Sequence, residues 1–203
     1  MDIPNGQNAL ACWNWFKNNS DLPDVAIAAL LGNFQAESGF MPNNLENRAN
    51  YQFNISDEGY CKAVNDKSYS RERFVNDAAG FGLAQWTYGP RKAKLYDSTV
   101  AKNIPVENLN TQCEYALYEL KQLFPSVYKF IKESNDIRAS TVKVLCEYEN
   151  PADQSDRMKS MRTQYAENIY QAFHSKESEN EADQIINDIK TKLDKLREVL
   201  NGA

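Results

Sequence analysis

The sequence predicts a mainly α-helical (α+β) domain that contains one loop-rich or small β-hairpin subregion and is followed by a C-terminal helix. Three observations support this prediction. Apolar residues recur at steps of three or four over most of the chain, as they do on one face of a helix. A polar middle segment, residues 43–81, lacks that repeat. The composition becomes highly charged after His174, so we divide the chain into residues 1–174 and residues 175–203.

Two helices are expected before the polar segment. The first covers residues 9–17, where apolar side chains lie near helical spacing. The second covers residues 24–38 and begins directly after Pro23. Gly39 suits the left-handed turn that follows many helices, and Pro42 prevents the helix from continuing. The second helix is therefore predicted with both of its ends.

The second of these helices carries a carboxyl group on its apolar face. That face follows steps of three, four and three through Ile27, Leu30, Phe34 and Glu37. A carboxyl group on such a face loses hydration of its charged form, and the negative end of the helix dipole adds to this effect. Both effects favour the protonated form, which a general acid needs. A solvated surface position is the alternative interpretation of Glu37.

The segment of residues 43–81 is rich in Asn, Asp, Ser and Gly, with scattered Tyr and Phe. This composition predicts loops and a short hairpin rather than a helix. Long segments without regular structure inside a compact domain are often functional. Because this segment directly follows the Glu37 helix, we expect it to contribute to a binding cleft.

Helical patterns return at Pro90, because proline is favoured at the first position of a helix. Asp136 can cap one of the later helices, and that helix stops before Pro151. The expected helices cover residues 91–98, 110–124, 126–133, 136–149 and 153–173. Together with the two earlier helices they predict one compact helical domain.

The C-terminal segment has a narrow apolar seam. Its members step by three or four residues, as in a short coiled coil: Ala182, Ile185, Ile189, Leu193, Leu196 and Leu200. A seam of this length is marginally stable by itself. We therefore expect residues 182–200 to self-associate, to pack back on the domain, or to attach it to another module.

The composition excludes several classes of function. The net charge is -5 and no run of Lys or Arg stands out, so no nucleic-acid partner is expected. No stretch is apolar enough to span a membrane. The first residues lack the basic and apolar regions of a signal peptide. If the protein acts outside a cell, another device must deliver it.

The cysteines and the single histidine restrict the chemistry. Cys12, Cys61, Cys113 and Cys146 are far apart and form no CxxC pair, so buried free thiols are expected. His174 lies beside a polar run and provides no partner for a Cys–His or Ser–His nucleophile. We expect no metal and no cofactor. Any catalysis should therefore depend on carboxyl groups.

A second distinctive run covers residues 80–88. Gly80 and Gly82 permit a tight backbone path or the close approach of a ligand. Gln85 offers both a hydrogen-bond donor and an acceptor. Trp86 and Tyr88 have flat apolar faces of the kind that pack on sugar rings, each with a polar tip. The alternative is a core tryptophan beside a turn.

Together the two runs resemble a known enzyme family. Glu37-Ser38-Gly39 followed by Gly82-Leu83-Ala84-Gln85 is similar to the first two motifs of goose-type lysozymes and lytic transglycosylases. The fuller pattern, from Gly32-Asn33 to Arg91, looks most like the phage tail lysozyme family. A later aromatic motif that ends in proline is echoed by residues 147–151. The resemblance covers roughly residues 6–173.

The resemblance implies a lysozyme-like fold and a muramidase or lytic transglycosylase. The substrate would be bacterial peptidoglycan, cleaved at the β-1,4 bond between N-acetylmuramic acid and N-acetylglucosamine. By the resemblance, Glu37 is the general acid, Gln85 and Trp86 line the glycan cleft, and Tyr148 is a further cleft residue. Such a lysin would act from a phage tail, or from the host cytoplasm after holin-type release.

The second carboxyl group is not fixed by the motifs. Hydrolysis normally uses a pair of carboxyl groups, whereas a transglycosylase lets a hydroxyl of the sugar attack. The choices in the polar segment are Asp57, Glu58, Asp66 and Asp77. We choose Asp77, because it lies just before the Gly80 turn, although it also suits turn capping. The remaining alternatives are Glu46, Glu147 and Glu149.

Two other functions compete with this hypothesis. One is a non-catalytic glycan-binding or phage tail structural module built on a lysozyme-like scaffold, against which the intact Glu37 argues. The other is cleavage of chitin or another N-acetylglucosamine polymer. Release of wall fragments distinguishes a lysin from a non-catalytic module. A comparison of peptidoglycan with chitin as substrates distinguishes a lysin from a chitin-cleaving enzyme.

Overall fold

The structure is a computed structural model that describes residues 3–201, with side chains beyond His174 described only at Ile186 and residues 189–192. Its helices are α1 (Gly6–Asn19), α2 (Asp24–Ser38), α3 (Asn47–Phe53), α4 (Asp57–Asn65), α5 (Arg71–Asn76), α6 (Gly89–Ser98), α7 (Leu109–Gln122), α8 (Pro125–Glu133), α9 (Ile137–Val144) and α10 (Asp156–Asn201). A 3₁₀ turn, η1 (Val100–Lys102), and a π-helical turn, η2 (Leu145–Glu149), complete the described elements. The prediction of a mainly α-helical protein is confirmed.

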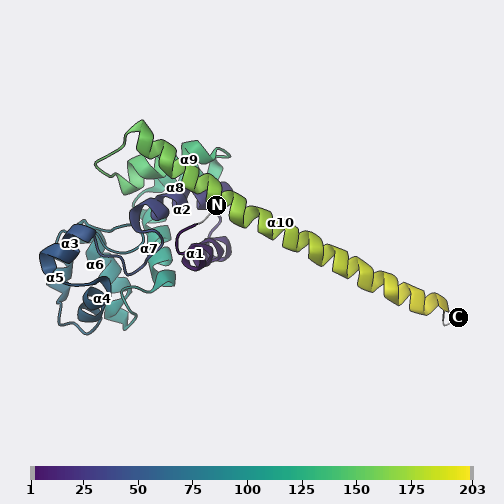
Figure 1. Cartoon of the computed structure of the whole chain (residues 1–203), viewed down its shortest axis with the longest axis horizontal. Helices are drawn as coiled ribbons and strands as arrows, with labels where there is room; N and C mark the ends of the chain where they lie inside the picture. The colour runs from purple at the N-terminus through teal and green to yellow at the C-terminus, as the bar shows by residue number, and fades with distance from the viewer. Residues whose placement is uncertain (1–2, 202–203) are drawn as a thin grey trace.

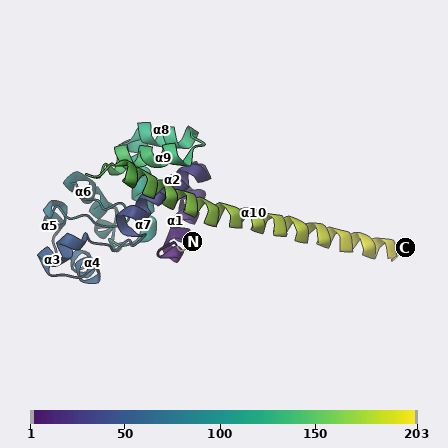
Figure 2. The same ribbon diagram turned by 45° about the horizontal axis from the view of Figure 1, so that its top comes forward.

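Helix α2 lies at the centre of the domain. It packs against α1, α9 and α10, and Ile27, Leu30 and Phe34 are fully buried. Burying each of these side chains contributes roughly 2 kcal/mol relative to leaving it exposed. Figures 1 and 2 show α3 to α6 on one side of the domain, and α8, α9 and the first part of α10 on the other. Helix α7 contacts α1, α6 and α8 and so connects the two sides.

The sequence predicted the ends of two helices well. Helix α2 covers residues 24–38 as expected, and Gly39 follows it with φ 58°, in the left-handed region. Asp136 caps α9 by accepting a hydrogen bond from the backbone N–H of Ala139 at 3.0 Å. At these ends a side chain or a glycine within the local sequence satisfies the backbone, so no distant partner is needed.

The prediction of loops or a hairpin over residues 43–81 is wrong in detail. The segment contains the short helices α3, α4 and α5, and within residues 3–201 only isolated bridges occur, from Leu45 to Phe81 and from Phe81 to Trp86. Ser56 and Ser70 cap α4 and α5 through their hydroxyl groups. Helices of one or two turns depend on tertiary packing for their stability. They also contain too few residues to show a recognisable apolar repeat in the sequence.

Helix α10 continues without a break from Asp156 to Asn201, across the change in composition at His174. Figures 1 and 2 show its C-terminal part extending away from the other helices. Of the predicted seam, only Ile189 has a described side chain, and it is half-exposed; the other seam side chains lie outside the described part. No helix among the described residues is long and apolar enough to cross a membrane.

All four cysteines are free, and three of them, Cys12, Cys61 and Cys113, are buried. The thiols of Cys12 on α1 and Cys113 on α7 lie 3.6 Å apart. Burial raises the pKa of both Cys61 and Cys113. These thiols therefore stay protonated and belong to the packing of the core rather than to a nucleophilic site.

Candidate active site

The C-terminal end of α2 carries Glu37 to the edge of the core. Phe34, one turn earlier, is fully buried, whereas the side chain of Glu37 is 17% exposed. Gly39 then reverses the chain in a left-handed conformation, and its N–H bonds back to the carbonyl of Gln35 at 3.1 Å. The helix end therefore holds the Glu37 carboxyl group at the boundary between the packed interior and solvent.

A buried arginine from α10 holds this carboxyl group. Arg162 Nη2 lies 2.7 Å from Glu37 Oε1, and its Nη1 donates to Asn33 Oδ1 at 3.0 Å. A Cβ on Gly32 would lie only 2.8 Å from the carbonyl oxygen of Arg162, so glycine permits this close approach of α10 to α2. The Gly32-Asn33 pair of the motif thus positions the arginine, which in turn positions Glu37.

The second motif contacts the first directly. Ser38 Oγ donates to the carbonyl of Leu83 at 3.0 Å, which joins the end of α2 to the Gly80–Tyr88 run. Gly82 has φ 75°, and a Cβ there would lie 2.7 Å from Gln112 Oε1. Gln85 also has a positive φ, 43°, and its Nε2 donates to the carbonyl of Asn44 at 3.1 Å. These contacts place Gln85 beside the end of the Glu37 helix.

The two motifs line a common cleft of about 440 Å³. Glu37 and Glu149 line it from the side of α2 and η2. The segment between α2 and α3, the second motif and the start of α6 also line it, through Glu46, Gln85, Tyr88 and Arg91. Glu37 and Gln85 are therefore brought together, as expected from the sequence.

Two expected cleft residues, Trp86 and Tyr148, do not line this cleft. They are 0% and 1% exposed, and their polar atoms donate to the buried Glu119 carboxylate at 2.7 and 2.8 Å. Tyr115 and Arg91 donate to the same carboxylate. Burial and the charge of Glu119 raise the pKa of Tyr148, so its hydroxyl remains a donor. Trp86 and Tyr148 thus have a structural role, because they hold the Glu119 carboxylate that anchors Arg91 at the cleft.

Asp77, the expected second catalytic carboxyl group, is also absent from the lining of this cleft. Its Oδ2 accepts from the hydroxyls of Tyr60 at 2.6 Å and Tyr69 at 3.3 Å, and its side chain, 2% exposed, pairs with the buried Lys92. Burial and the Asp77 charge raise the pKa of Tyr69 to about 12. Burial raises the pKa of both tyrosine hydroxyls and lowers the pKa of Lys92, and all three groups occupy the oxygens of Asp77 inside the core.

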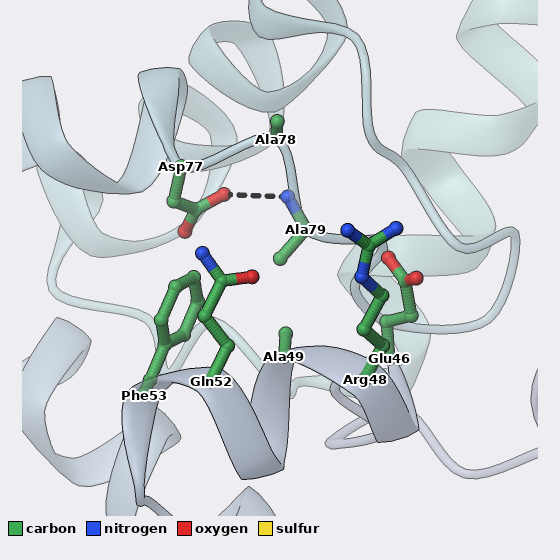
Figure 3. A pocket seen from close by; sticks show the side chains of 8 residues that line it. All are labelled: Glu46, Arg48, Ala49, Gln52, Phe53, Asp77, Ala78 and Ala79. Atoms are coloured by element: carbon green, nitrogen blue, oxygen red, sulfur yellow. Dashed lines mark hydrogen bonds between the residues drawn. The ribbon is translucent and has the colours of Figure 1, made fainter.

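A smaller hollow of about 260 Å³ lies on the other side of Glu46. Figure 3 shows Asp77 at one end of this hollow, bonded to the N–H of Ala79 at 3.0 Å, and Arg48 beside Glu46 at the other end. Glu46 lines both spaces. Its Oε2 accepts from the N–H of Gly80 at 3.1 Å, which fixes the carboxylate at the boundary.

Glu149 ends the π-helical turn η2, and Asn150 follows it in a left-handed conformation. Burial and the neighbouring Glu37 raise the pKa of Glu149 well above its usual range, against the opposing effect of Arg91 and Arg162. A carboxylic acid that stays protonated beside a second carboxyl group is typical of glycosidase sites. The sequence offered Glu149 only as an alternative, because a π-turn changes which side chains share a helix face.

Sequence reasoning did not find Arg162 or Glu119, although a signal was present. Arg162 lies four residues after Met158 and four before Ala166, on the apolar face of α10. Glu119 lies four residues after Tyr115 on the buried face of α7. A charged residue in an apolar stripe was the signal used for Glu37, and it applies equally to these two.

The described side chains include no group of three or more His, Cys, Asp and Glu arranged to hold a metal ion. The groups that the cleft offers for chemistry are carboxyl, amide, guanidinium and phenol groups. With a protonated carboxyl group and a second carboxylate, such a site can transfer a proton to a leaving oxygen and stabilise the charge that results.

Comparison with protein-family models gives one finding. Residues 7–173 match the family described as phage tail lysozyme. Because the match spans most of the chain, this chain belongs to the phage tail lysozyme family. A comparison with curated proteins finds no match. Membership indicates a lysozyme-like role in peptidoglycan degradation and fits a location in the phage virion.

Proposed function

We propose that this member of the phage tail lysozyme family cleaves the β-1,4 bond between N-acetylmuramic acid and N-acetylglucosamine, with Glu37 as the general acid. The observation that carries the proposal is the position of Glu37. Its carboxyl group lies at the end of a buried helix, faces a cleft of about 440 Å³, and shares that cleft with Glu149. The family match supports the substrate class.

In the proposed reaction, Glu37 gives its proton to the glycosidic oxygen as the bond to C1 breaks. The leaving sugar departs as an alcohol, and Glu37 is left as a carboxylate. Arg162 Nη2, 2.7 Å from Glu37 Oε1, then faces this negative charge. A fixed guanidinium needs no reorganisation when the charge appears, so it lowers the energy of the product side of the proton transfer.

The remaining cleft residues suit a glycan. Tyr88 is 69% exposed and offers the flat aromatic face that the buried Trp86 cannot offer. The Nε2 of Gln85 donates to Asn44 and to the carbonyl of Gly82, so the amide oxygen is the atom that we assign to an N–H or O–H group of an N-acetyl sugar. We assign to these two residues the positioning of the sugar next to Glu37.

For hydrolysis, we assign the base that activates water to Glu46 rather than to Asp77. Glu46 lines the cleft from the α3 side, whereas Glu37 enters it from α2. Inverting hydrolysis needs room for a water molecule between its two carboxyl groups. The alternative is a lytic transglycosylase, in which the C6 hydroxyl of muramic acid attacks C1. That alternative needs no enzymatic base.

Mass spectrometry of fragments released from purified peptidoglycan tests both parts of the proposal. We expect reducing muramic ends from a hydrolase and 1,6-anhydro ends from a transglycosylase. Glu37→Gln keeps the shape of the side chain and should abolish release, while Glu58→Gln on the exposed face of α4 should not change it. Full release by folded Glu37→Gln would overturn the role of Glu37. Binding to walls without fragments from the unaltered protein would favour a glycan-binding module.

We also propose where the protein acts and what its C-terminal segment does. We favour action from the phage tail, with residues 182–200 attaching the domain to another module or to a second copy. The continuous helix α10 supports this arrangement, because it carries the segment away from the catalytic domain. Light scattering on the whole chain distinguishes the two partners: a dimer mass indicates a second copy, and a monomer mass contradicts self-association.

A further inference from the structure

Glu149 has a buried carboxyl oxygen with no role in the proposed reaction. Its Oε1 is buried, and within the described residues it accepts no hydrogen bond. Its side chain nevertheless lines the cleft that Glu37 lines. A buried polar atom without a partner destabilises a fold by about 1–3 kcal/mol, so such atoms call for an explanation. Packing alone does not explain it, because Gln or Leu would fill a similar volume.

The charged groups that act on Glu149 come from four helices. Glu37 lies on α2, Arg91 on α6, Glu119 on α7 and Arg162 on α10. Arg91 is paired with Glu119 at 2.6 Å, and Arg162 is paired with Glu37 at 2.7 Å. The two guanidinium groups therefore already balance the two carboxylates. An ionised Glu149 would add an unbalanced negative charge in a buried place, so Glu149 stays protonated.

We propose that Glu149 and Glu37 share one proton, and that Glu149 is the positioning residue that supplies this proton to Glu37. The inference rests on the proposed function of Glu37 as the acid. When a glycosidic oxygen reaches Glu37, the O–H bond of Glu149 breaks as the new O–H bond forms on Glu37. Glu37 then protonates the leaving oxygen. Glu149 is left ionised and faces Arg91 and Arg162 until it takes a proton back from solvent through the cleft.

The shared proton has a consequence for the dependence of activity on pH. The last proton of a coupled carboxyl pair is held more tightly than the proton of either group alone, because its loss creates two neighbouring negative charges. Activity at rising pH should therefore persist further in the unaltered protein than in a protein in which Glu37 titrates without a carboxyl neighbour. If Glu149 had a structural role alone, its substitution would lower the rate at all pH values and would leave unchanged the pH at which activity is lost.

The test is the pH profile of kcat/KM on soluble peptidoglycan fragments for Glu149→Gln, with Glu147→Gln as the matched control. Glu147 is exposed on the same turn and pairs with Lys143. For Glu149→Gln we expect a loss of about 100-fold or more at the optimum and an alkaline limb moved to lower pH. Glu149→Asp should restore part of the limb, and Glu147→Gln should match the unaltered protein. If the alkaline limb of the pH profile does not move in folded Glu149→Gln, the proposed sharing of a proton between Glu149 and Glu37 is wrong.

A second measurement begins with the unaltered protein. NMR titration of the unaltered protein, labelled with ¹³C at the Glu carboxyl groups, should show one Glu carboxyl that titrates well above the usual range. That signal should be lost in Glu149→Gln. If all Glu signals titrate in the usual range, the pair is wrong. If Glu37→Gln keeps full activity, the proposed function itself fails; if Glu37→Gln is inactive while the limb of Glu149→Gln is unmoved, only the pair fails.

Discussion

Two sets of buried or half-buried carboxyl groups differ in how their oxygens are satisfied. Asp77 and Glu119 accept hydrogen bonds from tyrosine hydroxyls and pair with Lys92 and Arg91. Glu37 and Glu149 line the open cleft. Oε1 of Glu149 is buried and accepts no hydrogen bond within the described part of the chain, whereas Oε1 of Glu37 lies 2.7 Å from Arg162 Nη2.

This difference separates carboxylates that hold the fold from carboxyl groups that can exchange a proton. A carboxylate surrounded by donors is stabilised in its charged form and has no reason to take up a proton. A carboxyl group with an unsatisfied oxygen in a cleft is costly for the fold and available to a ligand. Burial alone does not distinguish the two kinds; the number and type of neighbouring donors does.

The largest effect on stability is expected for Glu119→Gln. The substitution leaves Arg91 without its charged partner and turns an amide N–H₂ toward Trp86 and Tyr148, which also donate. Breaking a buried ion pair from one side lowers the free energy of unfolding by about 3–5 kcal/mol. Urea unfolding measures this loss. Glu114→Gln, on the exposed face of the same helix, is the control and should change stability by less than about 0.5 kcal/mol.

A smaller loss is expected for Gly32→Ala. Its Cβ would lie 2.7 Å from the backbone nitrogen of Ala166 and 2.8 Å from the carbonyl of Arg162, so α10 must move away from α2. Overpacking of this kind costs about 1–3 kcal/mol. The movement also withdraws Arg162 from Glu37, so wall cleavage should fall together with stability. Gly6→Ala has no atom within 4 Å of the added Cβ and should leave both properties unchanged; unchanged cleavage in Gly32→Ala would contradict the role of Arg162.

The smallest effect, and one of opposite sign, is expected for the stability of Glu149→Gln. Above about pH 4.3 the unfolded chain releases the Glu149 proton, while the folded chain keeps it because the folded pKa is raised. The unaltered protein therefore loses stability as pH rises towards that raised pKa, and Glu149→Gln does not. Thermal unfolding at pH 7 should show the variant more stable than the unaltered protein, and the difference should shrink as the pH is lowered. A variant less stable than the unaltered protein would indicate a structural role.

The sequence predicted those features that depend on neighbouring residues. The bounds of α2, the left-handed Gly39 and the Asp136 cap follow from local rules. Glu37 and Gln85 were found because their motifs are adjacent to such local signals. Asp77 and Trp86 were expected in the cleft but do not line it, and their partners, Lys92 and Glu119, lie 15 and 33 residues away in the chain. Spacing indicates which face a side chain takes, but not which donors a distant helix brings to it.

The most direct measurement of the central claim compares the wall-cleavage rate of Glu37→Gln with that of the double variant Asp77→Asn/Lys92→Met. The double variant removes both charges of the Asp77–Lys92 pair, so it leaves no unpaired buried charge and should fold. We predict that it retains most of the unaltered rate, whereas folded Glu37→Gln loses at least about 100-fold. An inactive but folded double variant, or an active Glu37→Gln, would show that the chemistry belongs to the other pair of carboxyl groups.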